Sequence, residues 1–200
     1  MTIGGASFLG VVGFLTAISI PDIVAAESAN KYRVRAEVNR ARAEALGVED
    51  EFNEAEKNLR IALRSNESKN GINDPSVARD LRFMATLYRA RDKFAEAEAL
   101  IRWSLTIIED AQGPFSLDVA SNLIFLADLC FDRSRLKEAE TYYRQAVTIR
   151  EQLLGKDHPG VAEGLDHFAI LLRRLGRVDQ ADAMEARAKT IREDHASLLE

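Results

Sequence analysis

The residues best suited to catalysis in this sequence are three histidines and one cysteine, and their spacing forms no recognised motif. None of His158, His167 and His195 has a second histidine four residues later, so the HExxH pair of a zinc hydrolase is missing. Cys130 stands in an apolar run without a neighbouring base, which is typical of a small buried residue. The G-x-x-x-x-G-K-[ST] phosphate loop and the G-x-S-x-G motif of serine hydrolases are also absent. The sequence therefore predicts that the protein is not an enzyme and has no metal or cofactor.

Three arginines suggest a different chemistry, the noncovalent binding of carboxylates. Arg79, Arg82 and Arg89 are separated by three and seven residues, so they would lie on one face of one helix. A guanidinium group donates two parallel hydrogen bonds to a carboxylate. The spacing therefore predicts a helix face that contacts acidic residues of a ligand.

The composition indicates an all-α protein with one domain. The chain has 200 residues, of which 46% are hydrophobic and 30% are charged, and it contains only 4 Pro and 11 Gly. Ala, Leu, Glu and Arg are abundant, and these residues lose little conformational freedom in a helix. The formal net charge is −5 and no basic stripe alternates with aromatic residues, so we expect no nucleic-acid partner.

Residues 3–20 carry no charge and reach the lower limit of length for a membrane-spanning helix. Pro21 follows, and the small residues before a cut near Ala26 fit a signal-peptide cleavage site. We therefore expect residues 1–26 to be a signal peptide and the chain to be exported to the periplasm or secreted. Basic residues follow the apolar segment instead of preceding it, which favours a membrane anchor with cytoplasmic repeats as the alternative. A disordered or packed apolar tail is a third interpretation.

The remainder of the chain repeats with a period of 42 residues. The first half of the repeat is marked by Val77, Val119 and Val161, by Leu81, Leu123 and Leu165, and by Ala85, Ala127 and Ala169. The second half is marked by Ala55, Ala97, Ala139 and Ala181, each followed by an acidic residue, namely Glu56, Glu98, Glu140 and Asp182. Gly71, Gly113 and Gly155 mark the loops between units.

Each unit reads as a helical hairpin. Apolar residues at spacings of three and four indicate a first helix from about Val77 to Tyr88 and a second from about Phe94 to Ile108. The repeated alanines of the second helix are expected where the two helices cross, because a small side chain lets the helix axes approach.

The ends of the array become polar, as the outer helices of a repeat stack require. The inward position of Ile101 and Tyr143 becomes Glu185, and Lys189 follows one turn later. The first unit is recognisable mainly by Ala36, Ala43, Phe52 and Ala55, and its leucine position is Asn39. We therefore predict an α-α superhelix of about four hairpins over residues 31–195, with units of about 31–72, 73–114, 115–156 and 157–195.

The segment YRQAVTIREQLLGKDHP at residues 143–159 resembles a helix end and connector of the tetratricopeptide repeat family, in its 42-residue kinesin-light-chain-like form. This resemblance implies a superhelix in which the first helix of each unit lines a concave groove that binds peptides. Carrying the family's groove positions onto this chain implies contact residues in three units: Arg79, Arg82, Thr86 and Arg89; Ser121, Ile124, Asp128, Phe131 and Asp132; and Glu163, Asp166, Ile170, Arg173 and Arg174.

The Asn pair with which many such repeats bind the ligand backbone is replaced by Arg82-Phe83, Ile124-Phe125 and Asp166-His167, so recognition of motor cargo is not expected. We predict a module that binds an acidic and apolar peptide or protein, with an adaptor or assembly role. A self-associating scaffold and a regulatory subunit of a separate enzyme are the alternatives. A membrane partner through residues 3–20 stays open, and so does the oligomeric state.

Overall fold

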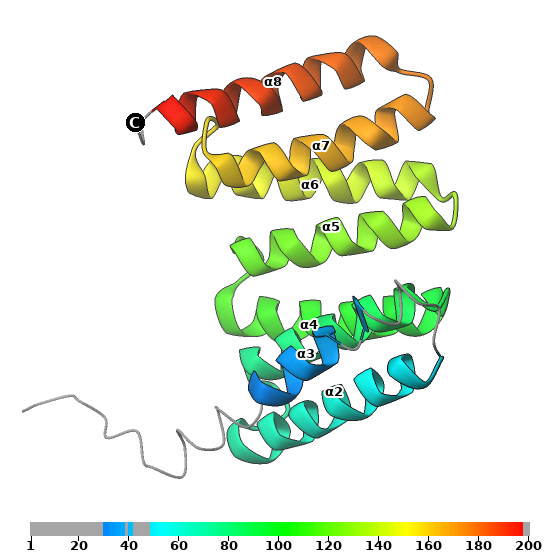
Figure 1. Cartoon of the computed structure of the whole chain (residues 1–200). Helices are drawn as coiled ribbons and strands as arrows, with labels where there is room; N and C mark the ends of the chain where they lie inside the picture. Colours follow the sequence, from blue (N-terminus) through cyan, green and yellow to red (C-terminus); the bar gives the residue numbers. More distant parts are fainter. Residues whose placement is uncertain (1–29, 39, 42–48, 198–200) are drawn as a thin grey trace, which may run out of the picture.

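The computed structural model describes residues 30–38, 40–41 and 49–197, and these residues form paired helices (Figure 1). Residues 30–38 and 40–41 belong to the first helix. The helices that follow are α2 (Glu49–Asn70), α3 (Pro75–Arg89), α4 (Phe94–Gln112), α5 (Leu117–Asp132), α6 (Leu136–Leu154), α7 (Pro159–Arg174) and α8 (Val178–Ser197). The prediction of an all-α chain built from four hairpins is confirmed.

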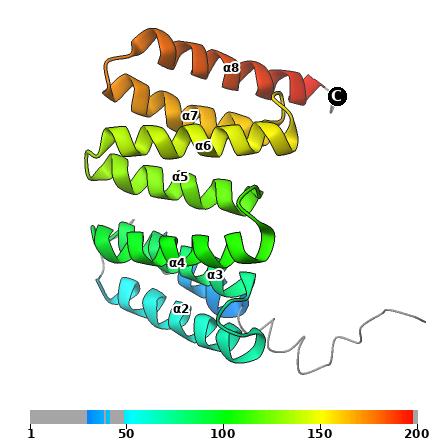
Figure 2. The ribbon, with the colours of Figure 1, turned by 180° about the vertical axis from the view of Figure 1, so that it is seen from behind.

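The helices stack in chain order from α2 to α8 (Figures 1 and 2). The most extensive contacts lie within the hairpins α3–α4, α5–α6 and α7–α8, and smaller contacts join α2 to α3, α4 to α5 and α6 to α7. The connections between helices lie on two opposite sides of the stack, because α3, α5 and α7 all begin on the same side (Figure 1). We call this side, with the loops around Gly71, Gly113 and Gly155, the loop end of the helices. The opposite side, with the tight turns inside each hairpin, is the turn end.

The same capping device starts each first helix at the loop end. The side chains of Asp74, Ser116 and His158 stand 42 residues apart and accept hydrogen bonds from backbone N–H groups of the first turn, at 2.8, 3.2 and 3.0 Å. The preceding glycines Gly71 and Gly155 both have φ of +90°, a left-handed conformation that favours glycine. His158 is therefore a helix cap.

The repeated alanines are fully buried, as expected for residues at the predicted helix crossings. Ala55, Ala97, Ala139 and Ala181 each have 0% exposed surface. Cys130 is also buried, and burial raises the pKa of its thiol, so it behaves as a small core residue. The packing confirms the positions predicted from the 42-residue period.

The acidic residues after the first three of these alanines, Glu56, Glu98 and Glu140, join neighbouring units at the turn end. Glu98 contacts Arg102 one helical turn later at 2.8 Å and Arg135 of the next unit at 2.6 Å. Glu140 pairs in the same way with Arg144 and with Arg177, both at 2.7 Å. Burial alone would raise the pKa of Glu98, but the hydrogen bonds from Arg102 and Arg135 outweigh it and lower the pKa. The periodic glutamates therefore form a ladder of ion pairs along the stack.

The last helix is polar, as expected for the end of an array. In α8 the residues packed into the core are Ala181, Ala188 and Ile191, whereas Lys189 is exposed. Glu185 pairs at the surface with Arg173 of α7 at 2.6 Å. In the first unit, Ala36, Phe52 and Ala55 are buried.

Asn39, Ala43 and the N-terminal region 1–26, for which a signal peptide or anchor is predicted, lie outside the described residues. Within the described part of the chain, no helix combines the length and the apolar character needed to cross a membrane.

Substitution of Ala139 by leucine tests the helix crossing. Because Ala139 has no exposed surface, the larger side chain should lower the free energy of unfolding by about 1–3 kcal/mol. Ala99 is an exposed alanine of α4, so Ala99→Leu serves as the control and should change stability by no more than about 0.5 kcal/mol. Urea denaturation followed by circular dichroism measures both. Equal stability of the two variants would contradict the assigned crossing.

Candidate binding face

The predicted contact residues lie on three successive first helices, and we call their common surface the α3/α5/α7 face. Arg79, Asp132, Glu163, Ile170, Arg173 and Arg174 are exposed, and Arg82, Thr86, Ser121, Phe131 and Asp166 are partly exposed. Ile124 and Asp128 are instead buried, with 8% and 9% exposed surface. The structure therefore places these two beneath the face, where they support it and do not reach a ligand.

One cleft of this face receives residues from all four units. It has a volume of about 520 Å³ and lies at the turn end, so we call it the turn-end cleft. Its lining includes Arg40 of the first helix, Thr86 and Arg89 of α3, Asp132 of α5 and Arg174 of α7. The structure thus brings together four of the residues predicted from sequence, although they span 89 positions of the chain, from Thr86 to Arg174.

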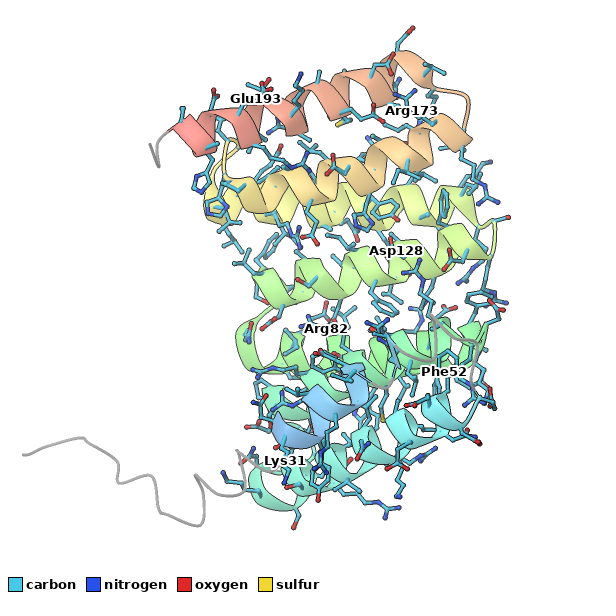
Figure 3. All side chains as sticks on the ribbon, in the orientation of Figure 1. Lys31, Phe52, Arg82, Asp128, Arg173 and Glu193 are labelled. Carbon is cyan, nitrogen blue, oxygen red and sulfur yellow. The ribbon has the colours of Figure 1, made fainter. Side chains whose placement is uncertain are left out.

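Asp128 is the centre of a polar network beneath this face and lies in the middle of the stack (Figure 3). Its carboxylate accepts hydrogen bonds from Arg89 Nη1 of α3, at 3.0 Å, and from the Tyr143 hydroxyl of α6. His167 Nδ1 of α7 lies 3.1 Å from the same carboxylate. Helices α3, α5, α6 and α7 are therefore joined through a single side chain.

The charge of Arg89 is balanced within the chain. Its guanidinium group spans two carboxylates, Asp128 at 3.0 Å and Asp132 at 2.6 Å. Burial would lower the pKa of Arg89, but these carboxylates raise it. Arg89 was predicted to bind carboxylates of a ligand, whereas in the structure it binds carboxylates of the neighbouring helix.

Arg174 is positioned differently, because no carboxylate of the described residues lies within ion-pair distance of it. Its guanidinium group stacks on the ring of Phe131, at 4.7 Å from the ring centre, and donates to Ser134 Oγ at 2.9 Å. The neighbouring Arg173, in contrast, is paired with Asp182 and Glu185. Arg174 is therefore a cation held by an aromatic ring at the edge of the turn-end cleft.

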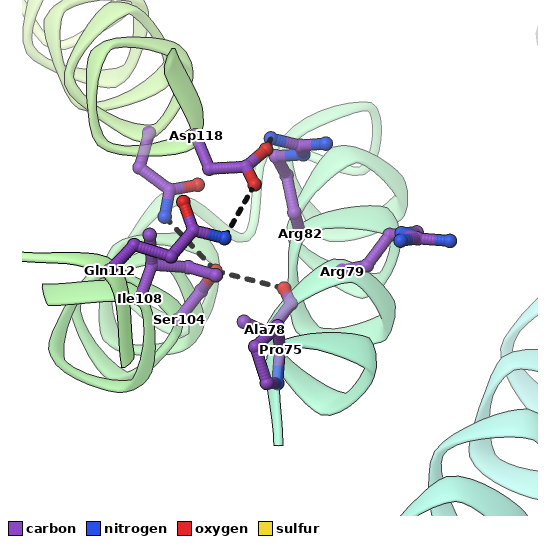
Figure 4. Close-up of a pocket in the computed structure, with 9 residues that line it drawn as sticks. Pro75, Ala78, Arg79, Arg82, Ser104, Ile108, Gln112 and Asp118 are labelled. Carbon is purple, nitrogen blue, oxygen red and sulfur yellow. Dashed lines mark hydrogen bonds and ion pairs between the residues drawn. The ribbon is translucent and has the colours of Figure 1, made fainter. Parts of the chain in front are cut away.

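A second, smaller cleft lies at the loop end of the same face, and we call it the loop-end cleft (Figure 4). Arg82 and Asp118 face each other at its mouth, 3.9 Å apart, and Gln112 donates a hydrogen bond to Asp118 at 3.1 Å. Deeper in the cleft, Asn122 Nδ2 donates to Ser104 Oγ at 3.1 Å, and Ser104 donates to the carbonyl oxygen of Ala78 at 2.8 Å.

The roles of two residues around Asp128 were missed in the sequence. His167 was considered as a metal ligand and as a replacement for one Asn of the family's pair, and Tyr143 only as a packing residue, yet both bind Asp128. A hydrogen bond between side chains 39 residues apart leaves no signal in the spacing of one helix. No group of three or more His, Cys, Asp or Glu side chains in the described residues is arranged to hold a metal ion. The chemistry that the face offers is therefore hydrogen bonding, ion pairing and apolar contact.

The sequence and the structure both match known repeat proteins. A model of the tetratricopeptide repeat family matches residues 34–110 and 118–194, and no curated protein matches the sequence. The chain is similar to the crystal structure of BtubC (BKLC) from P. vanneervenii, with a TM-score of 0.69 and 21% identity over 84% of this chain and 64% of that chain. This chain therefore spans less than two thirds of the length of that structure.

Two further structures are similar. One is a crystal structure of nearly identical, kinesin-light-chain-type TPR-like repeats from Podosopora anserina, with a TM-score of 0.65 and 20% identity over 84% of this chain and 78% of that chain. The other is MamA, with a TM-score of 0.53 and 11% identity over 90% of this chain and 98% of that chain. At these identities the similarities establish the fold alone, and they confirm its kinesin-light-chain-like type.

The network around Asp128 predicts a pH-dependent stability. The hydrogen bond to Asp128 raises the pKa of His167 above its ordinary value of 6.5, against the smaller effect of burial, while Glu163 raises it further and Arg89 opposes. A raised histidine pKa stabilises the fold fully below about pH 6.5, and this stabilisation disappears as the pH rises through the higher pKa of the folded state.

The free energy of unfolding of the wild type should therefore exceed that of a His167→Gln variant by a larger difference at pH 5.5 than at pH 8.5. The difference should stay below about 1 kcal/mol, because 37% of the His167 side chain is exposed to solvent screening. Chemical denaturation of both proteins at the two pH values measures it. The side chain of His195, near the end of α8, is exposed, so the same measurement on His195→Gln is the control. A wild-type advantage that grows with rising pH would contradict the assignment.

Proposed function

Because the chain belongs to the tetratricopeptide repeat family, whose repeats generally serve protein–protein interaction, we propose that it binds a segment of a partner protein along the α3/α5/α7 face. The observation that carries this proposal is the turn-end cleft, to which all four units contribute side chains. A surface assembled from successive repeats suits an extended or helical segment that runs along the stack.

The chemistry of the face favours a partner segment with acidic and apolar residues. Arg174 offers a guanidinium group that no carboxylate of the described residues neutralises, and its ring partner Phe131 offers an apolar surface beside it. Ile170, one helical turn before Arg174, has 55% exposed surface. An acidic side chain that binds Arg174 would thus place its neighbours against Phe131 and Ile170.

Arg89 has a supporting role in this proposal. Its two ion pairs hold α3 and α5 together beneath the ligand, so the acidic preference depends on Arg174 and not on Arg89.

We assign no catalytic role to the chain. The histidine on the face, His167, is bound to Asp128, and the Tyr143 hydroxyl is buried against the same carboxylate. Burial and this negative charge raise the pKa of Tyr143, which makes the hydroxyl a poor nucleophile. The protein instead fits an adaptor or assembly factor that brings a partner to a larger complex.

A peptide-display selection on the full chain, followed by affinity measurements, tests the proposal. The selection should enrich segments that combine Asp or Glu with apolar residues. Arg174→Glu should weaken binding of the selected peptides by about tenfold to a hundredfold, because a charge-assisted hydrogen bond is replaced by repulsion.

Arg144 is the matched control for this substitution. It is an exposed arginine on α6, outside the α3/α5/α7 face, so Arg144→Glu should change the affinity by less than about twofold. Selected peptides that bind equally well to both variants, or a selection without acidic residues, would exclude the proposed site.

A further inference from the structure

The chain contains three equivalent junctions between successive units, and their residues differ from one junction to the next. Each junction combines a residue from the start of a first helix, a residue near the end of the following second helix, and a residue of the next first helix. The 42-residue period relates three sets of residues: Arg33, Asn66 and Asp80; Pro75, Ile108 and Asn122; and Leu117, Arg150 and Gly164.

Guanidinium groups occupy both outer junctions. In the first, Arg33 Nε forms an ion pair with the carboxylate of Asp80 at 3.3 Å, although neither Arg33 Nε nor Asp80 Oδ1 makes a hydrogen bond within the described part of the chain. Asp80 has no exposed surface, and Asn66 Nδ2 donates to its other carboxylate oxygen. In the third, Gly164 has no side chain, and a Cβ atom at its position would lie 4.0 Å from Arg150 Nη1. The chain therefore places a planar group with N–H donors in each of these two spaces.

The middle junction has no such group of its own. Pro75 and Ile108 stand where Arg33 and Asn66 stand in the first junction, and neither has a side-chain donor. Asn122 is 1% exposed, and its Nδ2 is bound to Ser104, but its Oδ1 has no hydrogen-bond partner among the described residues. The space in front of it is the loop-end cleft, with a volume of about 80 Å³. This cleft therefore presents an unsatisfied, buried acceptor.

The mouth of the loop-end cleft carries both signs of charge. Arg82 and Asp118 lie 3.9 Å apart, and Figure 4 shows both side chains directed toward one another, whereas Arg79 points away from Asp118. A carboxylate that entered would meet Asp118 and would bring no donor for Asn122. A guanidinium group would bring donors but would meet Arg82 and Arg79. A neutral planar group that both donates and accepts hydrogen bonds avoids both conflicts.

We propose that the loop-end cleft is a subsite for the side-chain carboxamide of an Asn or Gln residue in the bound partner segment. The carboxamide N–H donates to Asn122 Oδ1, and its carbonyl oxygen accepts from Arg82, which has no hydrogen bond to Asp118 at their separation of 3.9 Å. This subsite rests on the proposed function of the α3/α5/α7 face, because a partner segment must deliver the side chain.

Titration of the ¹⁵N-labelled full chain with small probes tests the subsite without any partner. The probes are propanamide, propionate and methylguanidinium, which imitate the ends of Gln, Glu and Arg. Propanamide at concentrations up to about 100 mM should cause saturable shifts of the Asn122 side-chain amide and Arg82 Nε resonances, since a ligand of this size binds weakly. Propionate and methylguanidinium should bind at least about tenfold more weakly.

Two matched variants locate the binding. Pro75→Gln places a carboxamide at the position equivalent to Arg33, so it should fill the cleft and remove the propanamide shifts. Pro159→Gln makes the same change at the start of α7, one unit away from the cleft, and should leave the propanamide affinity within about twofold. Both positions are first residues of a helix, where glutamine is accepted without loss of a backbone hydrogen bond.

Three outcomes would overturn the subsite: an absence of saturable propanamide shifts, which means that water alone satisfies Asn122; tighter binding of propionate or methylguanidinium; or unchanged binding to Pro75→Gln. None of these outcomes affects the proposed function, which the Arg174→Glu measurement tests separately at the other end of the face. A failure of that measurement likewise leaves the propanamide result intact.

Discussion

The close approach of paired helices at four buried alanines is the constraint on which the rest of the structure depends. Ala55, Ala97, Ala139 and Ala181 have no exposed surface, and a methyl group at such a position lets paired backbones approach closely. Hairpins of similar geometry stack with a similar relation between neighbours, and the most extensive contacts between units join successive helices in the described residues. A surface feature of the described residues is therefore either a repeated contact between units or a departure from that repetition at one unit.

The fold could be predicted from the sequence because the determinants of a hairpin lie within 42 consecutive residues. The apolar spacing, the alanines and the loop glycines gave the helices and their order, and the structure adds the shared capping role of Asp74, Ser116 and His158. The role of the repeated glutamates was not predictable in the same way. Glu98 and Glu140 were visible as a periodic signal, but their partners Arg135 and Arg177 belong to the following unit and approach only when the hairpins stack.

The binding face shows the same limit more sharply. Helical spacing correctly grouped Arg79, Arg82 and Arg89 on α3, but the availability of each charge depends on the neighbouring helices. Arg89 meets two carboxylates of α5, whereas Arg82 remains 3.9 Å from one. Equivalent positions of the repeat also differ in depth, so that Asp128 supports the face from below. These differences arise from contacts between residues about 40 positions apart, which no single-helix pattern encodes.

The buried network around Asp128 explains how a stack of independent hairpins can present a fixed surface. A solenoid changes curvature when neighbouring units rotate against each other. The Asp128 carboxylate is bound by side chains of α3, α6 and α7, so it resists that rotation. Each lost hydrogen bond would leave a buried polar group unpaired. The turn-end cleft lies over this network, so its geometry is set before a partner arrives. A partner then loses less free energy in ordering the protein, and the modest number of available charges on the face suffices for recognition. The middle junction, in contrast, has Pro75 and Ile108 where the first junction has Arg33 and Asn66, so a ligand there can supply the donor that Asn122 Oδ1 lacks among the described residues.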